Sequence, residues 1–217
     1  TTPPGREASN LPLIMLPHGG PQARDNYGFD PWSQFLAARG YAVFQPQFRG
    51  SEGFGRDFIT MAHGEWGRSM QDDVSDAVHH FVETGVAARD RVCLFGWSYG
   101  GYMTLKQLEA DPGLYAAGIS GAPVTKWELY DTHYTERFMG DPREVPEAYE
   151  TASAIPDATK IADPLLLIHG MADDNVLFTH STMLYKHLQD LAIPFETMDY
   201  PGKKHSIRGK QTGIHLY

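Results

Sequence analysis

The chain has 217 residues, 41% of them hydrophobic, and its 27 acidic and 18 basic side chains give a formal charge of −9. This composition is typical of one globular domain with a sizeable core. An acidic chain without a run of Lys or Arg is a poor match for nucleic acid or for an anionic membrane surface. The apolar runs Leu13–Leu16 and Leu165–Ile168, among the longest, have four residues each, whereas a helix that crosses a bilayer needs about 20.

The cysteine content and the N-terminal segment bear on disulfides, metal sites and the cell compartment. Cys93 is the single cysteine, so neither an internal disulfide nor a thiolate metal cluster is expected, and no cofactor is predicted. Residues 1–6 lack the basic region and apolar stretch of a signal peptide, which leaves the cytoplasm and the periplasm both open as compartments.

Short apolar runs alternate with helical patterns along the chain. The expected buried strands are Leu13–Leu16, Tyr41–Phe44, Arg91–Trp97, Ala116–Ser120, Leu165–His169 and Phe195–Tyr200. The expected helices are Pro31–Arg39, Ser69–Thr84, Tyr99–Ala110 and Thr179–Leu191. This alternation predicts βαβ units, and hence an α/β fold with a mostly parallel sheet that carries helices on both faces.

Two further features of these elements are predicted. Ser69 and Asp72 have the spacing of a capping box at the start of the second helix. The segment Val124–Thr159 is long, rich in aromatic and acidic residues and free of strand patterns, so it is expected to form a helical insertion over the carboxyl edge of the sheet. Ligands of open α/β sheets bind at that edge.

The strongest chemical signal is the G-x-S-x-G motif centred on Ser98, directly after the predicted strand Arg91–Trp97 and directly before a helix. A serine at such a strand-to-helix turn presents its Oγ to substrate, and its neighbours must be glycine because the turn is cramped. The N-terminus of the helix, beginning at Tyr99, directs backbone N–H groups toward an oxyanion formed beside the serine. The motif therefore predicts a nucleophile, with an incidental glycine-rich turn as the alternative.

A serine nucleophile requires a base and an acid that orients the base. Asp173 and Asp174 follow the strand Leu165–His169, and His205 follows the last predicted strand. The resulting chain order of Ser, Asp and His is that of an α/β-hydrolase triad. From the residues alone, either aspartate could be the acid and the other a helix or loop cap.

A second oxyanion donor is expected from the glycine-rich turn that follows the first strand, His18-Gly19-Gly20-Pro21. The two glycines allow a backbone N–H to approach the substrate closely. The alternative is a plain turn before a long loop.

Together these residues resemble the catalytic domain of the prolyl oligopeptidase family of serine peptidases, with an α/β-hydrolase fold, over nearly the whole chain. The segments that carry the resemblance are His18–Pro21, Phe48–Gly55, Gly96–Gly101, Ala122–Arg137 and His169–Val176. The last three are most similar to the dipeptidyl peptidase IV branch, whereas the first half is closer to the acylaminoacyl peptidases.

The resemblance implies roles for further residues. It assigns the triad acid to Asp173, a contact with a substrate carbonyl to Asn175, and a pocket for proline or alanine at P1 to a set of apolar and aromatic side chains: Val124, Trp127, Tyr130, Tyr134, Val176 and Tyr99. Aromatic walls suit a flat apolar ring. The alternative is that Trp127, Tyr130 and Tyr134, spaced i, i+3 and i+7, form the core face of one helix.

Two departures from the family pattern affect these expectations. His18 stands where the dipeptidyl peptidase IV pattern has a tyrosine that supplies an oxyanion hydroxyl, so a backbone N–H of Gly19 or Gly20 is the expected donor. Family members also carry a β-propeller before the hydrolase domain and about eight strands in the sheet. Neither the propeller nor more than six strands is predicted in residues 1–217, so a catalytic domain truncated at both ends is expected.

Three functions are compatible with these sequence features. The triad and the Val124–Arg137 segment favour a serine exopeptidase of the dipeptidyl or acylaminoacyl type that takes peptide substrates. The same triad would serve a carboxylesterase. A non-catalytic interaction protein of the same fold is the third, although such a protein usually loses the nucleophile. A homo-oligomer is compatible with all three.

Overall fold

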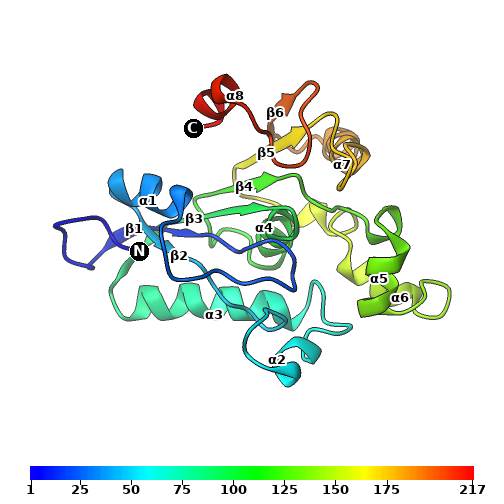
Figure 1. The fold of residues 1–217 in the computed structure, drawn as a ribbon, viewed down its shortest axis with the longest axis horizontal. Coiled ribbons are helices and arrows are strands. Elements are labelled where there is room, and N and C mark those ends of the chain that lie inside the picture. The colour runs from blue at the N-terminus through cyan, green and yellow to red at the C-terminus, as the bar shows by residue number, and fades with distance from the viewer.

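The computed structural model describes residues 1–217 as a six-stranded sheet between two layers of helices (Figure 1). The strands lie in the order β2-β1-β3-β4-β5-β6, and every neighbouring pair is parallel. They are β1 (Leu11–Met15), β2 (Ala42–Phe44), β3 (Ala87–Trp97), β4 (Ala117–Gly121), β5 (Leu165–Gly170) and β6 (Glu196–Tyr200). The predicted α/β class is confirmed.

Eight α-helices accompany the sheet. They are α1 (Pro31–Ala38), α2 (Arg56–Thr60), α3 (Ser69–Glu83), α4 (Tyr99–Ala110), α5 (Thr132–Met139), α6 (Pro146–Ala152), α7 (Thr179–Asp190) and α8 (Lys210–Leu216). Short 3-10 turns occupy Trp127–Leu129 and Ala158–Lys160. The four helices expected from the sequence all form, each with ends within one residue of those predicted, whereas α2 and α8 were not predicted.

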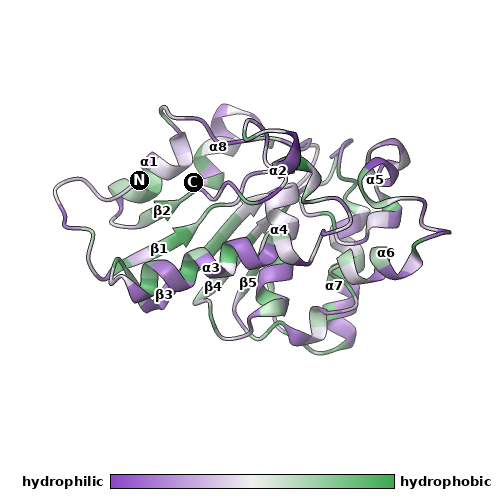
Figure 2. Cartoon of the chain, turned by 90° about the horizontal axis from the view of Figure 1, so that it is seen from below, coloured by the Kyte–Doolittle hydropathy of each residue, from purple (hydrophilic) through white to green (hydrophobic).

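The two faces of the sheet are covered unequally. Side chains of α3, α4 and α7 share one core of 32 buried residues with the strands. On the opposite face, Trp32 of α1 stacks on Phe95 with ring centroids 4.5 Å apart, and Leu216 of α8 packs on a cluster of three buried residues. In Figure 2, α3 alternates between hydrophobic and hydrophilic colours, as expected for a helix with one face on the core. No helix combines the length and the apolarity that crossing a bilayer would require.

Two local predictions are wrong. Ser69 is the first residue of α3 rather than its cap, the N-cap residue is Arg68 without a side-chain hydrogen bond, and the Ser69 hydroxyl donates to Glu65 at 2.8 Å. Strand β3 begins at Ala87, four residues before its predicted start at Arg91. Its additional residues include exposed charged side chains, which do not have the apolar pattern of a buried strand.

The sheet brings its functional segments to one edge. Because all strands are parallel, the turns after β1, β3, β5 and β6 leave the same side of the sheet. Helices α5 and α6 lie beyond these carboxyl ends (Figure 1). The segment between β4 and β5, predicted as a helical insertion, thus consists of helices and turns and contains no strand.

Candidate active site

Ser98 occupies the sharp turn between β3 and α4, with a φ of 62° and a ψ of −121°. A residue with a Cβ seldom adopts a positive φ, so the surrounding structure must hold this backbone in place. It does so through the Ser98 N–H, which donates to the carbonyl of Gly121 on β4 at 2.8 Å. The turn therefore has the strained geometry that the motif predicted.

The glycines on either side of Ser98 are sterically required. A Cβ on Gly96 would lie 2.1 Å from the carbonyl oxygen of Gly100, and a Cβ on Gly100 would lie 2.1 Å from the carbonyl oxygen of Pro17. Both contacts are with backbone atoms, which cannot move aside as a side chain could. The second contact also seats the loop after β1 directly on the start of α4.

The backbone of two segments lies next to the Ser98 side chain. Tyr99 is the first residue of α4, so its N–H has no acceptor within the helix. The loop after β1 approaches from the other side, where a Cβ on Gly19 would lie 3.4 Å from the Ser98 Cβ and 3.9 Å from its Oγ. The Gly20 carbonyl, by contrast, accepts a hydrogen bond from the hydroxyl of Tyr134.

The His18 side chain is engaged away from Ser98. Its ring stacks on Phe48 with centroids 4.4 Å apart, its Nδ1 lies 2.7 Å from the Gly19 carbonyl oxygen, and its Nε2 lies 2.9 Å from the Ser51 Oγ. Burial lowers the pKa of His18. Both ring nitrogens of His18 thus have polar partners other than Ser98.

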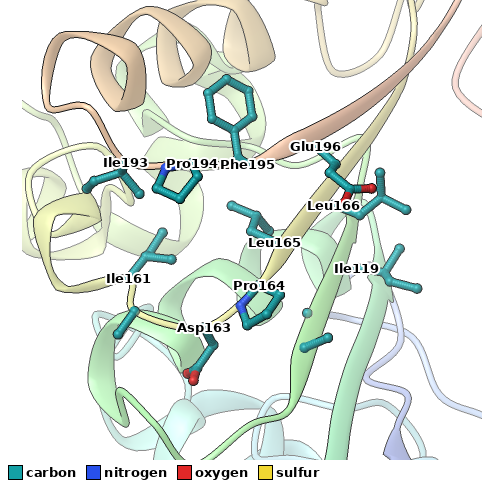
Figure 3. A pocket seen from close by; sticks show the side chains of 13 residues that line it. Ile119, Ile161, Asp163, Pro164, Leu165, Leu166, Ile193, Pro194, Phe195 and Glu196 are labelled. Atoms are coloured by element: carbon teal, nitrogen blue, oxygen red, sulfur yellow. The ribbon is translucent and has the colours of Figure 1, made fainter.

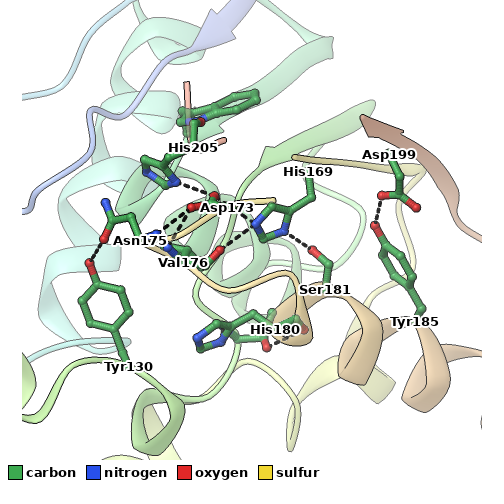
Figure 4. Close-up of polar contacts among 12 residues, drawn as sticks. Tyr130, His169, Asp173, Asn175, Val176, His180, Ser181, Tyr185, Asp199 and His205 are labelled. Carbon is green, nitrogen blue, oxygen red and sulfur yellow. Dashed lines mark hydrogen bonds and ion pairs between the residues drawn. The ribbon is translucent and has the colours of Figure 1, made fainter. Parts of the chain in front are cut away.

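Asp173 and His205 meet in space although they lie 32 residues apart in the chain (Figure 4). His205 Nδ1 and Asp173 Oδ2 are 2.7 Å apart, the Asp173 side chain is fully buried, and the His205 side chain is 20% exposed. Burial acts to raise the pKa of Asp173, but hydrogen bonds from His169, His205 and the Asn175 N–H outweigh it and hold the pKa far below its usual range. Asp173 is therefore a carboxylate that can orient an imidazole.

The neighbouring carboxylate has a different environment. Asp174 is 62% exposed and pairs with the Lys204 ammonium at the surface, and this hydrogen bond lowers the pKa of Asp174. The structure thus pairs His205 with the first of the two adjacent aspartates.

The loop that carries His205 is attached to the residue before Ser98. The indole N–H of Trp97, the residue immediately before Ser98, donates to the His205 carbonyl at 2.8 Å. The Ser98 hydroxyl itself makes no hydrogen bond with the His205 ring, whose polar partner is Asp173. In unliganded sites this contact is often long and tightens when substrate binds.

The residues proposed for the specificity pocket form a chain of contacting rings. Trp127 lies on a 3-10 turn and Tyr134 on α5, with Tyr130 in the extended link between them. The single-helix alternative is therefore wrong: the Asp131 side chain accepts the His133 N–H and caps a new helix. Successive centroids are 5.9 Å apart for Trp127–Tyr130 and 5.4 Å apart for Tyr130–Tyr134, both edge to face.

The proposed pocket residues differ in burial: four are fully buried and two are half-buried. The residues 2% exposed or less are Tyr99, Val124, Trp127 and Val176, whereas Tyr130 and Tyr134 are half-buried. The Tyr130 hydroxyl donates to Asn175 Oδ1 at 2.6 Å. Because the amide oxygen is occupied, the Asn175 NH₂ group is left to donate elsewhere, as contact with a substrate carbonyl would require.

Two contributors to this region were not predicted from the sequence. Trp66 is 1% exposed, and its ring lies 4.2 Å from that of Trp127 and 5.5 Å from that of Tyr99. It comes from the loop before α3, where no pattern suggested a site. His169, fully buried at the end of β5, lies 3.2 Å from Asp173 through its Nε2, and its spacing of four residues from Asp173 was the available signal.

A cavity of about 520 Å³ lies elsewhere (Figure 3). It opens at the amino ends of β4, β5 and β6, opposite to the edge that bears Ser98, and its lining includes Ile161, Leu165 and Phe195. No serine or histidine lines it. The residues expected to form the triad therefore lie at the turns after the strands and not in this cavity.

Comparison with known proteins agrees with this geometry. A dipeptidyl aminopeptidase BIII from Pseudoxanthomonas mexicana is 37% identical over 216 residues, which cover 94% of this chain and 31% of that protein. Dipeptidyl peptidase 4 from Sus scrofa is 35% identical over 217 residues, covering 97% of this chain and 28% of that protein. The chain therefore spans about a third or less of the length of these relatives.

Solved structures show the same similarity in three dimensions. The crystal structure of Porphyromonas gingivalis dipeptidyl peptidase 4 matches 100% of this chain and 31% of that one, with a TM-score of 0.93 at 35% identity. Pyrococcus horikoshii acylaminoacyl peptidase matches 100% of this chain and 37% of that one, with a TM-score of 0.90 at 29% identity. The model of the prolyl oligopeptidase family matches residues 27–217. By sequence, fold and arrangement of the site, the chain belongs to the prolyl oligopeptidase family of peptidases.

Proposed function

We propose that this protein hydrolyses peptide bonds through an acyl-enzyme formed on Ser98, with His205 as general base and Asp173 as the acid that orients it. The observation that carries the proposal is the 2.7 Å contact between His205 Nδ1 and Asp173 Oδ2 at the edge where the strained Ser98 turn lies. The names and similarity of the relatives support the same chemistry.

The proposal gives each group a step. With the Nδ1 proton held by Asp173, the other ring nitrogen of His205 is free to accept the proton from Ser98 Oγ as that oxygen attacks the scissile carbonyl carbon. The negative charge that develops on the carbonyl oxygen is stabilised by the N–H groups of Tyr99 and of Gly19 or Gly20. His205 then gives the proton to the departing amine, and a water molecule, deprotonated by His205, releases the acyl group from Ser98.

The substrate class follows from the aromatic pocket. We propose that Val124, Trp127, Tyr130, Tyr134 and Val176 accommodate proline or alanine at P1, while the Asn175 amide donates to a substrate carbonyl. Aromatic walls with one fixed polar group suit a small flat ring. The relatives include both dipeptidyl peptidases and acylaminoacyl peptidases, and both types are compatible with this pocket.

One set of substrates separates the proposed activities. A chromogenic Gly-Pro anilide reports peptidase activity and p-nitrophenyl acetate reports esterase activity, so hydrolysis of the ester alone would favour the carboxylesterase alternative. A fluorophosphonate probe that labels the protein but not the Ser98→Ala variant would support the nucleophile. Absence of labelling in a folded protein would favour the non-catalytic alternative and overturn the proposal.

The N-terminal preference is tested in the same assay. The pocket residues Val124, Trp127, Tyr130, Tyr134, Asn175 and Val176 include no carboxylate, so a substrate ammonium has no charged partner among them. Such a contact would be worth roughly 1.5–3 kcal/mol. We therefore expect free-amine and N-blocked Gly-Pro substrates to react at similar rates with the 217-residue chain. A strong preference for the free amine would mean that another acidic side chain of the chain recognises it.

A further inference from the structure

His169 connects the proposed triad acid to helix α7. It lies at the end of β5, four residues before Asp173, and has no exposed surface. Its Nε2 is 3.2 Å from Asp173 Oδ2 and 2.9 Å from the carbonyl oxygen of Val176, and its Nδ1 is 2.7 Å from the Oγ of Ser181 on α7 (Figure 4). Both ring nitrogens thus have polar partners.

The partners determine where the ring proton is. A carboxylate oxygen and a carbonyl oxygen only accept hydrogen bonds, so Nε2 must carry the proton that both receive. A hydroxyl can donate, so Ser181 can complete the neutral ring by donating to Nδ1. This arrangement selects the Nε2–H tautomer of His169 and directs its N–H at Asp173.

The contact falls on the oxygen that His205 uses. Asp173 Oδ2 is shared by His169 and His205, while Oδ1 accepts the N–H groups of Asn175 at 2.9 Å and Val176 at 3.1 Å. Four donors therefore fix the rotation of one buried carboxylate. His169 also holds the Val176 carbonyl, so it ties the turn that carries the proposed pocket residues to the same carboxylate.

We propose that His169, with its tautomer selected by Ser181, is a positioning residue for Asp173. It holds Asp173 Oδ2 in the direction that His205 Nδ1 requires, and it withdraws part of the negative charge that Asp173 would otherwise present to His205. The inference rests on the proposed function of the Ser98, Asp173 and His205 triad, and it adds a fourth side chain to it.

The other titratable groups around His169 are paired or neutral. His180 of α7 accepts the Thr125 N–H through Nδ1 at 3.2 Å, and burial, with a smaller effect from the nearby His169, lowers its pKa to about 4. Also on α7, Tyr185 donates to Asp199 of β6 at 2.7 Å. The Phe178 ring meets His169 edge-on at 5.5 Å. Near pH 7 the charged group that His169 faces is therefore Asp173.

The test compares two substitutions of His169 in the 217-residue chain. His169→Phe removes the donor at similar volume, whereas His169→Gln can place an amide N–H near the same point. With p-nitrophenyl acetate we expect His169→Phe to lower kcat about 10- to 100-fold, the range for loss of a hydrogen bond to a charged group, with KM within about twofold. The acidic limb of the kcat/KM profile should move to higher pH, because the freed carboxylate favours protonated His205 more strongly.

Two further variants guard against a merely structural effect. Ser181→Ala should move the acidic limb of the kcat/KM profile in the same direction, but by less. If His169→Phe does not fold, the shift in Ser181→Ala tests the proposal instead. Ser153→Ala, which removes a buried hydroxyl bonded at 2.8 Å to the Tyr149 carbonyl, should leave the limb in place. Rates are normalised to the fraction of folded protein labelled by a fluorophosphonate.

A readout that does not need turnover separates this inference from the proposed function. The proton between His205 and Asp173 should give a far-downfield ¹H NMR resonance that changes in His169→Phe and is retained in His169→Gln. If the resonance changes but the wild type hydrolyses no substrate, the proposed function fails and the positioning role stands. Equal behaviour of the Phe and Gln variants, with unmoved acidic limbs and unchanged resonances, would overturn the inference.

Discussion

Trp97 and His205 are joined by a hydrogen bond from the indole N–H to the backbone carbonyl, 2.8 Å long and spanning 108 residues of sequence. Trp97 ends β3 immediately before Ser98, so the loop of the proposed base is attached directly to the turn of the proposed nucleophile. The Trp97 ring also packs against Trp32 of α1, with centroids 5.9 Å apart. The position of His205 therefore depends on the helical layer as well as on the sheet edge.

Replacing Ser98 by Ala should abolish hydrolysis without unfolding the protein. The hydroxyl of the next residue, Tyr99, is buried and donates to Met70 Sδ at 3.3 Å, so it cannot take over the attack. We therefore expect kcat/KM to fall on the order of 10³-fold or more, while the far-ultraviolet circular dichroism spectrum is unchanged. Ser75→Ala removes a partly buried hydroxyl of α3 that donates to Asp111 and accepts from Gln107, away from Ser98. It is the control and should keep activity near that of the wild type. Substantial turnover by the Ser98 variant would show that another residue is the nucleophile.

The adjacent aspartates offer a matched pair of variants. Asp173→Asn should lower kcat about 10³- to 10⁴-fold, because an amide no longer favours the Nδ1–H tautomer of His205. Asp174→Asn removes an exposed pair with Lys204, which is worth little, and should change kcat less than about twofold. Similar losses in the two variants would contradict the assignment of the acid.

Tyr130→Phe tests how the Asn175 amide is oriented. The substitution removes the hydroxyl that donates to Asn175 Oδ1 at 2.6 Å, so the amide is free to rotate. Loss of one such hydrogen bond corresponds to about 0.5–1.5 kcal/mol. We expect KM for a Gly-Pro anilide to rise by roughly 2- to 10-fold while hydrolysis of p-nitrophenyl acetate is little altered. The exposed Tyr27→Phe is the control, and an equal effect on both substrates would argue against an orienting role.

His180 should make the protein less stable in mild acid. Burial lowers its pKa in the folded state from 6.5 to about 4, so below pH 6.5 the unfolded chain binds a proton that the folded chain does not. The free energy of unfolding should therefore fall as the pH decreases, by about 2 kcal/mol between pH 7 and pH 5. Urea unfolding at the two pH values measures the change.

His180→Asn is the informative variant in that experiment. Asparagine can still accept the Thr125 N–H, which lies 3.2 Å from His180 Nδ1, but it does not titrate. The variant should lose less stability than the wild type between pH 7 and pH 5. If the two proteins respond identically, the acid sensitivity arises from another group.

The positions of the main elements and of the proposed triad could be predicted because they depend on local patterns. The glycines around Ser98 and the order of strand, turn and helix are visible in a single stretch of sequence. The start of β3 was missed because Arg89 and Asp90 are exposed and charged, and they lie in the irregularity between the β1 pairs Leu11–Ala87 and Leu13–Val92. Helix α8 was missed because its few apolar residues become an apolar face only where they meet the α1 side of the sheet.

The contacts that complete the site depend on tertiary structure. Trp66 joins the aromatic cluster because the loop before α3 passes over Tyr99 and Trp127. His169 faces Asp173 because the turn after β5 folds back on the end of its own strand, while α7 supplies Ser181. In the sequence Trp66 has no pattern that points to its partners, and for His169 the spacing of four residues from Asp173 is the one local signal.

The close contact between Gly100 and the Pro17 carbonyl limits which substitutions this part of the protein can accept during evolution. The backbone donors and the nucleophile turn are assembled by contacts that tolerate no added atom, so this part of the molecule has few viable substitutions. Tyr130 and Tyr134 stand on a separate segment with half-buried side chains, whose hydroxyls bond to Asn175 and to the Gly20 carbonyl. Under the proposed function, new substrate preferences can therefore arise by substitution at these two positions while the turn that carries Ser98 is kept.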